Sequence, residues 1–243
     1  RPSTRNSKIQ TPPRLWKAAK GPWRKNMRLN KHPDPSTMLA YAAGTVNEGL
    51  SLVMAAHLEL CPECREMLAD AEALGGGLLD RLPPTELSKT GIEQIWERIE
   101  ADPTPEQTPR PQIETWGLPA VLAPYLPGGL DAVNWHTLVP GIKQLLLKNV
   151  DSGQGSVRLL YISPGNKVPD HTHLGSELTL VLKGSFYDEL GHYHYGDLAD
   201  LDSSVTHQPI VDSDEPCICL IATDQKLKFT SALNRMLQPL VGI

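Results

Sequence analysis

The stretch "GNKVPDHTHLGSELTLVLKG", residues 165–184, decides the fold of the second half of the chain. In a strand, His171 and His173 point to the same side, because successive side chains alternate between the two faces. A tight turn at Gly175 allows the next strand to return Glu177 toward them. The stretch therefore predicts two neighbouring strands that gather two imidazoles and one carboxylate.

A fourth ligand of this group is expected from the segment "GDLADLDSSVTHQP", residues 196–209. A turn at its start and a later strand would bring the imidazole of His207 back toward the first three side chains. His192 and His194 are the spare candidates for this position. Three imidazoles and a carboxylate suit Zn, Fe, Mn or Ni, so the residues predict a divalent metal without naming it. The alternative is that these histidines face solvent in an ordinary hairpin.

Further strand-like runs surround this group and are separated by turn residues. They are "IKQLLLKNV" (142–150), "SVRLLYISP" (156–164), "HYHYGDLADL" (192–201) and "PCICLIATD" (216–224). We expect residues 114–243 to form an all-β domain, an antiparallel barrel. Cys217 and Cys219 alternate on one strand and share a face, so they are either a redox pair or two core thiols.

Residues 102–113, "DPTPEQTPRPQI", contain four prolines and predict an extended linker. Ahead of the linker the apolar period changes from about 2 to about 3.6, which predicts a small helical bundle over residues 31–101. Three helices are expected before the glycines at 75–77, and a fourth over 88–102 with Ile92, Ile95, Trp96 and Ile99 facing inward.

A second cluster of metal-binding side chains lies in the helical half, in "MAAHLELCPEC", residues 54–64. Residues at i, i+4 and i+7 share one helix face, so His57, Cys61 and Cys64 project together on one helix, or on two helices that meet near Cys61. His32 is the natural fourth ligand. Two thiolates and two imidazoles predict a closed, structural zinc site. The alternative is a buried core histidine with two small core cysteines.

The charge of the chain is divided sharply. Residues 1–31 carry ten Lys or Arg and no Asp or Glu, although the whole chain has 23 basic and 28 acidic side chains. We expect residues 1–30 to be a basic, disordered extension, with a nucleic-acid or membrane arm as the alternative. The strongly acidic remainder argues against direct nucleic-acid binding and favours a basic protein partner.

Several classes of protein are disfavoured by what the sequence lacks. No run of about 18 apolar residues predicts a membrane helix, and no secretory signal precedes the first helical pattern. The four cysteines are too sparse for a disulfide-rich secreted fold. We therefore expect a cytoplasmic protein without membrane contact.

Two motifs carry a resemblance to a known family. A histidine ahead of "STMLAYAAGTVNEGLSLVMAAHLELCPECR" (36–65) resembles the zinc-binding anti-sigma domain of bacteria, in its ChrR-type form. The spacing from Gly165 to Gly184 is similar to the first cupin motif. The resemblance covers residues 32–243 and implies a multidomain α + β protein, with an N-terminal zinc-stabilised helical bundle and a C-terminal cupin-like β-barrel.

The resemblance also implies a function. It indicates an anti-sigma factor, not an enzyme, that binds and inhibits an extracytoplasmic-function sigma factor of the sigma-E type in a 1:1 complex. The cupin-like domain would sense singlet oxygen or related oxidants and trigger release. Zn²⁺ would occupy the helical site, and Zn²⁺ or another divalent metal the cupin site. The alternative is a metal-dependent, dioxygenase-like cupin enzyme with a helical oligomerisation module.

Overall fold

The computed structural model describes most of the helical and β regions. The described residues are 29–86, 88, 90–101 and 117–229. The expected disordered extension, except for its last two residues, and the expected linker at 102–113 lie outside them. Within the described ranges, no helix is both long and apolar enough to cross a membrane.

Four α-helices and two 3₁₀ turns precede the strands. They are α1 (Pro35–Ala42), α2 (Glu48–Leu60), α3 (Pro62–Leu79), α4 (Gly91–Ala101), η1 (Ala120–Leu122) and η2 (Leu130–Ala132). Side-chain caps start the first two helices. The Asp34 carboxylate accepts a hydrogen bond from the backbone N–H of Ser36 at 2.8 Å, and the Asn47 side chain accepts one from Leu50 at 2.8 Å.

Helix α3 runs further than the sequence predicts. It passes through Gly75–Gly77 and ends at Leu79, with Asp80 as its C-cap. None of these three glycines adopts a positive φ. Glycine in a helix interior costs about 1 kcal/mol relative to alanine, which lowers the stability of a helix without forbidding it. The three consecutive glycines therefore did not mark the end of helix α3.

The second half consists of antiparallel strands in three sheets. The strands are β1 (His136–Val139), β2 (Ile142–Leu146), β3 (Ser156–Ile162), β4 (His171–His173), β5 (Glu177–Lys183), β6 (Ser185–Asp188), β7 (Gly191–His194), β8 (Leu198–Leu201), β9 (Thr206–His207), β10 (Cys217–Thr223) and β11 (Leu227–Phe229). The sheet orders are β1-β2-β3-β10-β5-β8, β11-β4-β9 and β6-β7. The predicted cupin-like fold is confirmed.

The large sheet buries both of its faces. On β5, Leu178 and Leu180 belong to one core cluster, while Val181 belongs to a second cluster together with Cys217 and Cys219 of β10. Because side chains alternate along a strand, the two clusters lie on opposite faces of the sheet. The second cluster fills the interior of the barrel.

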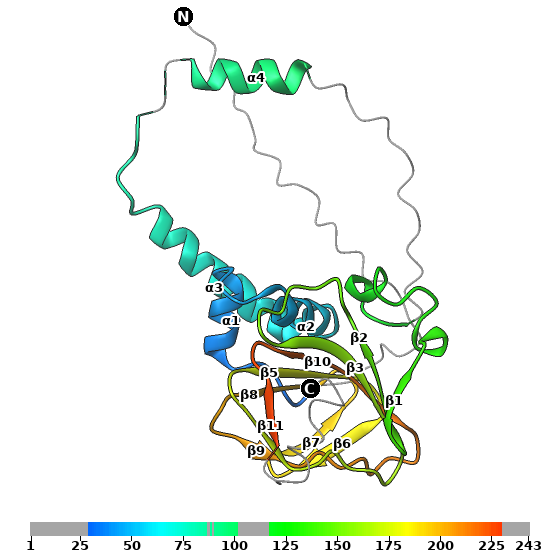
Figure 1. Ribbon diagram of the computed structural model, residues 1–243. Helices are drawn as coiled ribbons and strands as arrows, with labels where there is room; N and C mark the ends of the chain where they lie inside the picture. The colour runs from blue at the N-terminus through cyan, green and yellow to red at the C-terminus, as the bar shows by residue number, and fades with distance from the viewer. Residues whose placement is uncertain (1–28, 87, 89, 102–116, 230–243) are drawn as a thin grey trace, which may run out of the picture.

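Helix α2 closes the outer face of this sheet (Figure 1). Its Val53 and Met54 are fully buried in the same core cluster as Leu180 and Leu220 of the sheet. At the start of the helix, a Cβ on Gly49 would come within 2.7 Å of the Val157 side chain. The helices and the barrel therefore share one continuous apolar core.

Helix α4 forms where the sequence predicts it, but its apolar face does not turn inward. Figure 1 shows the helix away from the rest of the described chain, and none of its residues is buried. The four side chains of that face are 55–58% exposed: Ile92, Ile95, Trp96 and Ile99. The predicted inward packing is wrong, because no other described element lies against this face.

Candidate metal centres

The helical metal group collects its side chains from three chain segments. His57 lies in the last turn of α2, and Cys61 is both the C-cap of α2 and the N-cap of α3. Cys64 follows in the first turn of α3. His32 comes from the extended segment ahead of α1, whose Lys31 carbonyl accepts a hydrogen bond from Leu198 of β8. The joint at Cys61, rather than one continuous helix, brings the thiols beside the imidazole.

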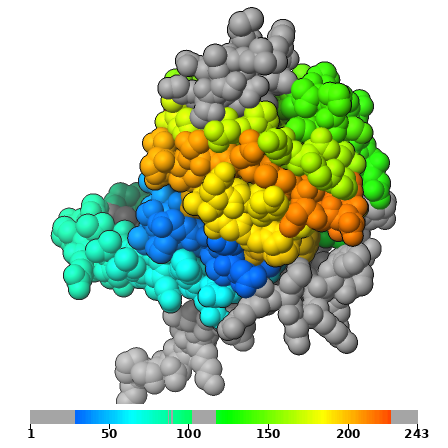
Figure 2. Space-filling model, turned by 90° about the horizontal axis from the view of Figure 1, so that it is seen from below, coloured from blue at the N-terminus to red at the C-terminus, as the bar shows by residue number. Residues whose placement is uncertain are grey.

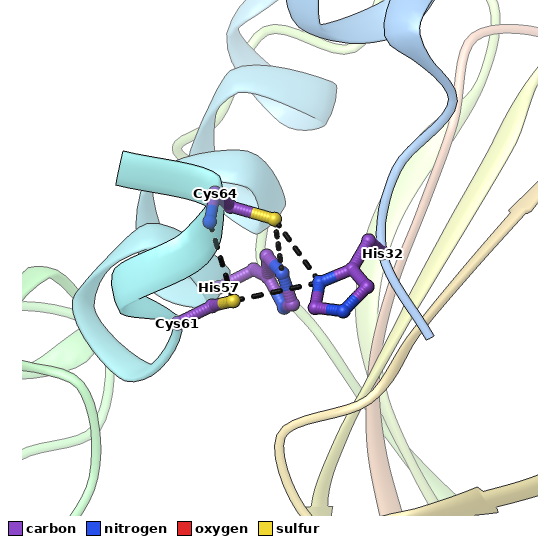
Figure 3. Close-up of side chains that lie close together, drawn as sticks. All are labelled: His32, His57, Cys61 and Cys64. Carbon is purple, nitrogen blue, oxygen red and sulfur yellow. Dashed lines mark hydrogen bonds between the residues drawn. The ribbon is translucent and has the colours of Figure 1, made fainter. Parts of the chain in front are cut away.

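The four side chains converge with the spacing of a tetrahedral site. Figure 3 shows the thiols of Cys61 and Cys64 facing the rings of His32 and His57. His32 Nδ1 lies 3.3 Å from Cys64 Sγ and 3.5 Å from Cys61 Sγ, and His57 Nε2 lies 3.2 Å from Cys64 Sγ. Tetrahedral zinc with its usual bond lengths would separate sulfur and nitrogen ligands by about 3.5 Å. The group is compatible with zinc.

The protonation of this group also suits a cation. His57 Nδ1 donates to the carbonyl of Gly196 at 2.9 Å, which leaves the lone pair of Nε2 directed at the thiols. A hydrogen bond from Cys64 lowers the pKa of the Cys61 thiol to about 3, with His57 and the Cys64 N–H adding to the effect. The same hydrogen bond, together with burial, raises the pKa of Cys64. A divalent cation would stabilise both as thiolates.

The barrel metal group is built on strands. His171 and His173 lie on β4, Glu177 begins β5, and His207 lies on β9, where it is paired in register with His171. All four side chains are buried. Their ligand atoms lie within 4.8 Å of one another, as do those of the helical group. The tight turn between β4 and β5 thus returns the carboxylate beside the imidazoles, as the sequence predicts.

Three imidazole nitrogens of the barrel group point at one another. His207 Nε2 lies 3.2 Å from His171 Nε2 and 3.3 Å from His173 Nε2. Nitrogen ligands on a tetrahedral zinc lie about 3.3 Å apart. His173 Nδ1 is buried without a hydrogen-bond partner, and it lies 3.4 Å from Glu177 Oε2. The convergence of three Nε2 atoms is a feature that a bound cation would explain.

Burial keeps the imidazoles of His171 and His173 neutral. It lowers the pKa of His171 to about 4, and the neighbouring carboxylate of Glu177 offsets only part of this effect. Burial, followed by repulsion from His207, lowers the pKa of His173 to about 4. Neutral imidazole is the form that binds metals. His171 and His207 also donate from Nδ1, to the Pro169 carbonyl at 2.9 Å and to Asp188 at 2.8 Å, so both present Nε2.

The spare histidines lie elsewhere. His192 and His194 are exposed on β7, their rings 4.3 Å apart, and His192 pairs with Asp212 at 3.0 Å. The structure thus brings His207, rather than either of them, to the other three ligands. Cys217 and Cys219 are buried inside the barrel with their sulfurs 3.6 Å apart. Their contact and their burial raise the pKa of Cys219.

Sequence reasoning missed the side chains that hold the ligands in place. The carboxylates of Asp188 and Asp197 are both buried. Asp188 accepts a hydrogen bond from His207 in the barrel group, and Asp197 accepts one from the backbone of Asn30, beside the helical group. Neither residue belongs to a spacing motif, because the fold alone brings Asp188 to His207 and Asp197 to the backbone beside His32. A buried aspartate next to a strand turn, as in "YGD" at 195–197, was the only available signal.

The two groups differ in what they can do chemically. Two thiolates and two imidazoles fill a tetrahedron with soft ligands, so the helical group can hold zinc tightly without an open position. Three imidazoles and a carboxylate make a harder ligand set that accepts several divalent metals. The helical group is thus suited to holding chain segments together, and the barrel group to binding one of several divalent metals.

Comparisons with known proteins agree with this architecture. The family described as "ChrR Cupin-like domain" matches residues 129–227. The chain is 38% identical over 220 residues to the anti-sigma-E factor ChrR of Cereibacter sphaeroides, covering 89% of this chain and 100% of that protein. It is also similar to a chain in the crystal structure of Rhodobacter sphaeroides SigE in complex with the anti-sigma ChrR. That match has a TM-score of 0.66 and 37% identity, and covers 81% of this chain and 99% of the other.

Proposed function

This chain belongs to the family of the anti-sigma-E factor ChrR, and from that premise we propose that it binds and inhibits a sigma factor of the extracytoplasmic-function, sigma-E type. The observation that carries the proposal is the identity of 38%, which extends over the full length of ChrR and so includes both the helical and the barrel parts. The complex is proposed to be 1:1 and to form in the cytoplasm, where sigma factors bind RNA polymerase.

Membership of a family of anti-sigma factors makes this chain a regulator and not the metal-dependent enzyme that the cupin motif alone would allow. The barrel ligand set alone could not decide between the two, because oxygen-activating enzymes use similar ligands. No second function is therefore carried forward.

The exposed apolar face of α4 is the surface we assign to the sigma factor. Ile92, Ile95, Trp96 and Ile99 recur at helical spacing and are more than half exposed. The C-terminal part of α3 is also apolar and exposed, at Leu74, Leu78 and Leu79, as is Leu82 just beyond it. Apolar helix faces of this size usually mark protein interaction sites. Neither face packs against another described element, so both are free to bind a partner.

The charge of the chain supports the same partner. Beyond the basic N-terminal residues, acidic side chains greatly outnumber basic ones. On α4 itself the apolar face is flanked by Glu93, Glu97 and Glu100. A sigma factor carries basic surfaces for DNA, and opposite charge speeds the encounter of two proteins more than it sets their affinity. The helix thus offers apolar contacts with an acidic border.

We further propose the occupants of the two metal groups. Zn²⁺ fits the helical group, where it would fix the segment of His32 to the joint between α2 and α3. Zn²⁺ or another divalent metal fits the barrel group, where the three imidazoles and Glu177 would hold it. The argument for both rests on the ligand types and on the tetrahedral spacing described above.

Release of the sigma factor on an oxidative signal is the last part of the proposal. The barrel would sense singlet oxygen or a related oxidant, because its interior holds three buried imidazoles and, outside the metal group, two buried thiols. The helices would respond, because they share a core with the barrel. Inhibition would thus depend on the helices and relief on the barrel.

Co-expression of the full chain with candidate sigma factors tests the proposal. We expect a 1:1 complex by light scattering and two metal ions per chain by atomic absorption. Trp96→Ala should weaken binding about 30-fold, as is usual for a buried interface aromatic, without changing the melting temperature. Gln94→Ala, on the same helix, is the control. If no candidate sigma factor co-purifies, or if Trp96→Ala binds as tightly as the wild type, the corresponding part of the proposal fails.

A further inference from the structure

A buried aspartate of the barrel holds the chain segment that carries His32. Asp197 is only 1% exposed and lies in the turn between β7 and β8. Its Oδ1 accepts hydrogen bonds from the backbone N–H groups of Asn30 at 2.8 Å and Lys31 at 3.2 Å. Its Oδ2 accepts one from the N–H of His194 at 2.9 Å. One carboxylate thus ties the segment next to the first metal ligand to the end of β7.

The same turn positions a second ligand of the helical group. The carbonyl of Gly196 accepts the Nδ1 proton of His57 at 2.9 Å, across 139 residues of sequence. Gly196 has a φ of +86°, and a Cβ at this position would lie 2.7 Å from the side chain of Leu29. Both histidines of the helical group are therefore oriented by barrel residues 196 and 197.

The hairpin β6–β7 connects this turn to the barrel metal group. At the end of β6, the fully buried carboxylate of Asp188 accepts the Nδ1 proton of His207 at 2.8 Å. The hairpin returns from Asp188, which pairs with Gly191, to His194, which pairs with Ser185. It leads directly into the turn that contacts the helical group.

Three further contacts join the strands of this hairpin to each other and to the N-terminal segment. The rings of Phe186 and Tyr193 stack across the two strands with centroids 4.7 Å apart. Lys31 Nζ donates to the carbonyl of Leu190 in the hairpin turn at 3.0 Å and lies 5.3 Å from the Tyr193 ring. In Figure 2 the hairpin (yellow) lies beside the segment that leads to α1 (blue).

We propose that the hairpin β6–β7 mechanically couples the two metal groups, with Asp188 and Asp197 as the positioning residues at its two ends. A change of His207 would move Asp188 and the hairpin, and would withdraw Gly196 and Asp197 from the histidines of the helical group. The coupling is reciprocal, because two sites that share one element influence each other equally. The inference rests on the proposed function, since it names the route by which the barrel would loosen the helices.

The test uses the full chain loaded with Co²⁺ at both groups. Only the helical group has thiolate ligands, so thiolate-to-cobalt charge-transfer absorption reports on that group alone. The measured quantity is the rate at which a chelator removes this absorption. Asp197→Asn should raise the rate about tenfold and shift the band, as expected for a lost partner outside the ligand shell. Asp202→Asn is the matched control, because Asp202 is an exposed aspartate that caps Ser204 in the next turn.

The coupling itself is tested from the other end of the hairpin. Asp188→Asn is distant from the thiolates, yet it should change the same rate by about fivefold, the lower range of coupling between sites. Combined with Asp197→Asn it should add nothing further. Lys31→Met, at an exposed side chain, should act in the same direction with a smaller effect and guards against variants that fail to fold.

The inference is overturned if Asp197→Asn loses cobalt at the rate of Asp202→Asn, or if Asp188→Asn and Lys31→Met leave the thiolate band and its loss unchanged in folded protein. The readout needs no sigma factor, so a chain that binds none would still report the coupling. Conversely, unchanged cobalt loss in variants that still bind and release a sigma factor would reject the coupling and leave the proposed function intact.

Discussion

The helical group takes its four candidate ligands from three segments between residues 32 and 64. The segment that carries His32 belongs to no helix or strand. The barrel group takes its ligands from β4, β5 and β9, which are fixed by backbone hydrogen bonds within sheets. In the first arrangement a metal would add to the few hydrogen bonds that hold the His32 segment, such as those of Asp197 with the backbone of Asn30 and Lys31. The second is largely formed before a metal arrives.

We infer from this contrast that metals bound at the two groups would have different roles. A metal that joins separate segments contributes its binding free energy to folding. A metal in a preformed frame can come, go or change its ligands while the frame persists, which is what a sensor requires. Four experiments, ordered from the largest expected effect to the smallest, separate these roles.

Removal of one thiol should have the largest effect. Structural zinc binding is worth about 10–16 kcal/mol in small domains, comparable with the whole stability of a protein. Cys64→Ala should therefore lose zinc and much of the helical circular dichroism of α1–α3. Cys217→Ala, at a buried cysteine outside both groups, is the control and should remain folded. If zinc-free Cys64→Ala kept its native helix content, the helical group would not need a metal to fold, which would contradict the contrast between the two groups.

Removal of a barrel ligand should cost less. His207→Ala should lose the barrel metal and about 3 kcal/mol, equivalent to a fall in melting temperature of about 10 °C, while the strands persist. The remaining metal should be zinc bound to thiolates. His192→Ala, an exposed histidine on β7, should keep both metals. Global unfolding of His207→Ala would show that the barrel frame is not preformed.

Acid should destabilise the metal-free barrel. The pKa values of His171 and His173 are lowered to about 4, so the unfolded chain takes up protons near pH 6.5 before the folded chain does. Stability should fall by about 3 kcal/mol for each of the two histidines as the pH drops from 6.5 to 4, and level off below that. Urea unfolding of chelator-treated protein at several pH values measures this. His171→Gln should flatten the profile, and a flat wild-type profile would contradict the buried neutral imidazoles.

The junction between the two groups gives the smallest effect. Gly196→Ala should cost about 2 kcal/mol, because both the positive φ and the contact with Leu29 oppose a Cβ. Gly44 has a similar φ of +67°, but a Cβ at this position would have no atom within 4 Å. Gly44→Ala should therefore lower the free energy of unfolding by only about 1 kcal/mol. Denaturant melts of the two variants isolate the contact. If the two variants lose the same free energy of unfolding, the contact between the turn at Gly196 and Leu29 of the N-terminal segment adds nothing to the cost.

Much of the fold follows from local patterns. The helical period before the glycines predicted α2, and its apolar side chains Leu50, Val53, Met54 and Leu58 are buried. The strands were recognisable because their side chains alternate between two buried faces. Spacing along a helix grouped His57, Cys61 and Cys64, and spacing along a strand grouped His171 and His173, because it fixes which residues share a face. The other candidate ligands, His32, Glu177 and His207, came from separate segments.

The rest depends on contacts that sequence spacing does not encode. The apolar stripe of α4 indicated a helix. A stripe alone does not show whether that face packs against the protein's own core or against a binding partner. The carboxylates of Asp188 and Asp197 are buried. Their hydrogen-bond partners come beside them only after strands that are distant in the sequence have paired. The continuity of the core between α2 and the large sheet likewise arises from tertiary packing, not from any local signal.

The most direct test of the account is the rate at which the full chain releases its sigma factor, with and without singlet oxygen from an illuminated photosensitiser. The wild-type complex should dissociate faster in the light than in the dark. The His207→Ala complex should form and inhibit, but should dissociate at one rate in both conditions. Light-induced release from His207→Ala equal to that of the wild type would contradict the assignment of inhibition to the helices and of sensing to the barrel.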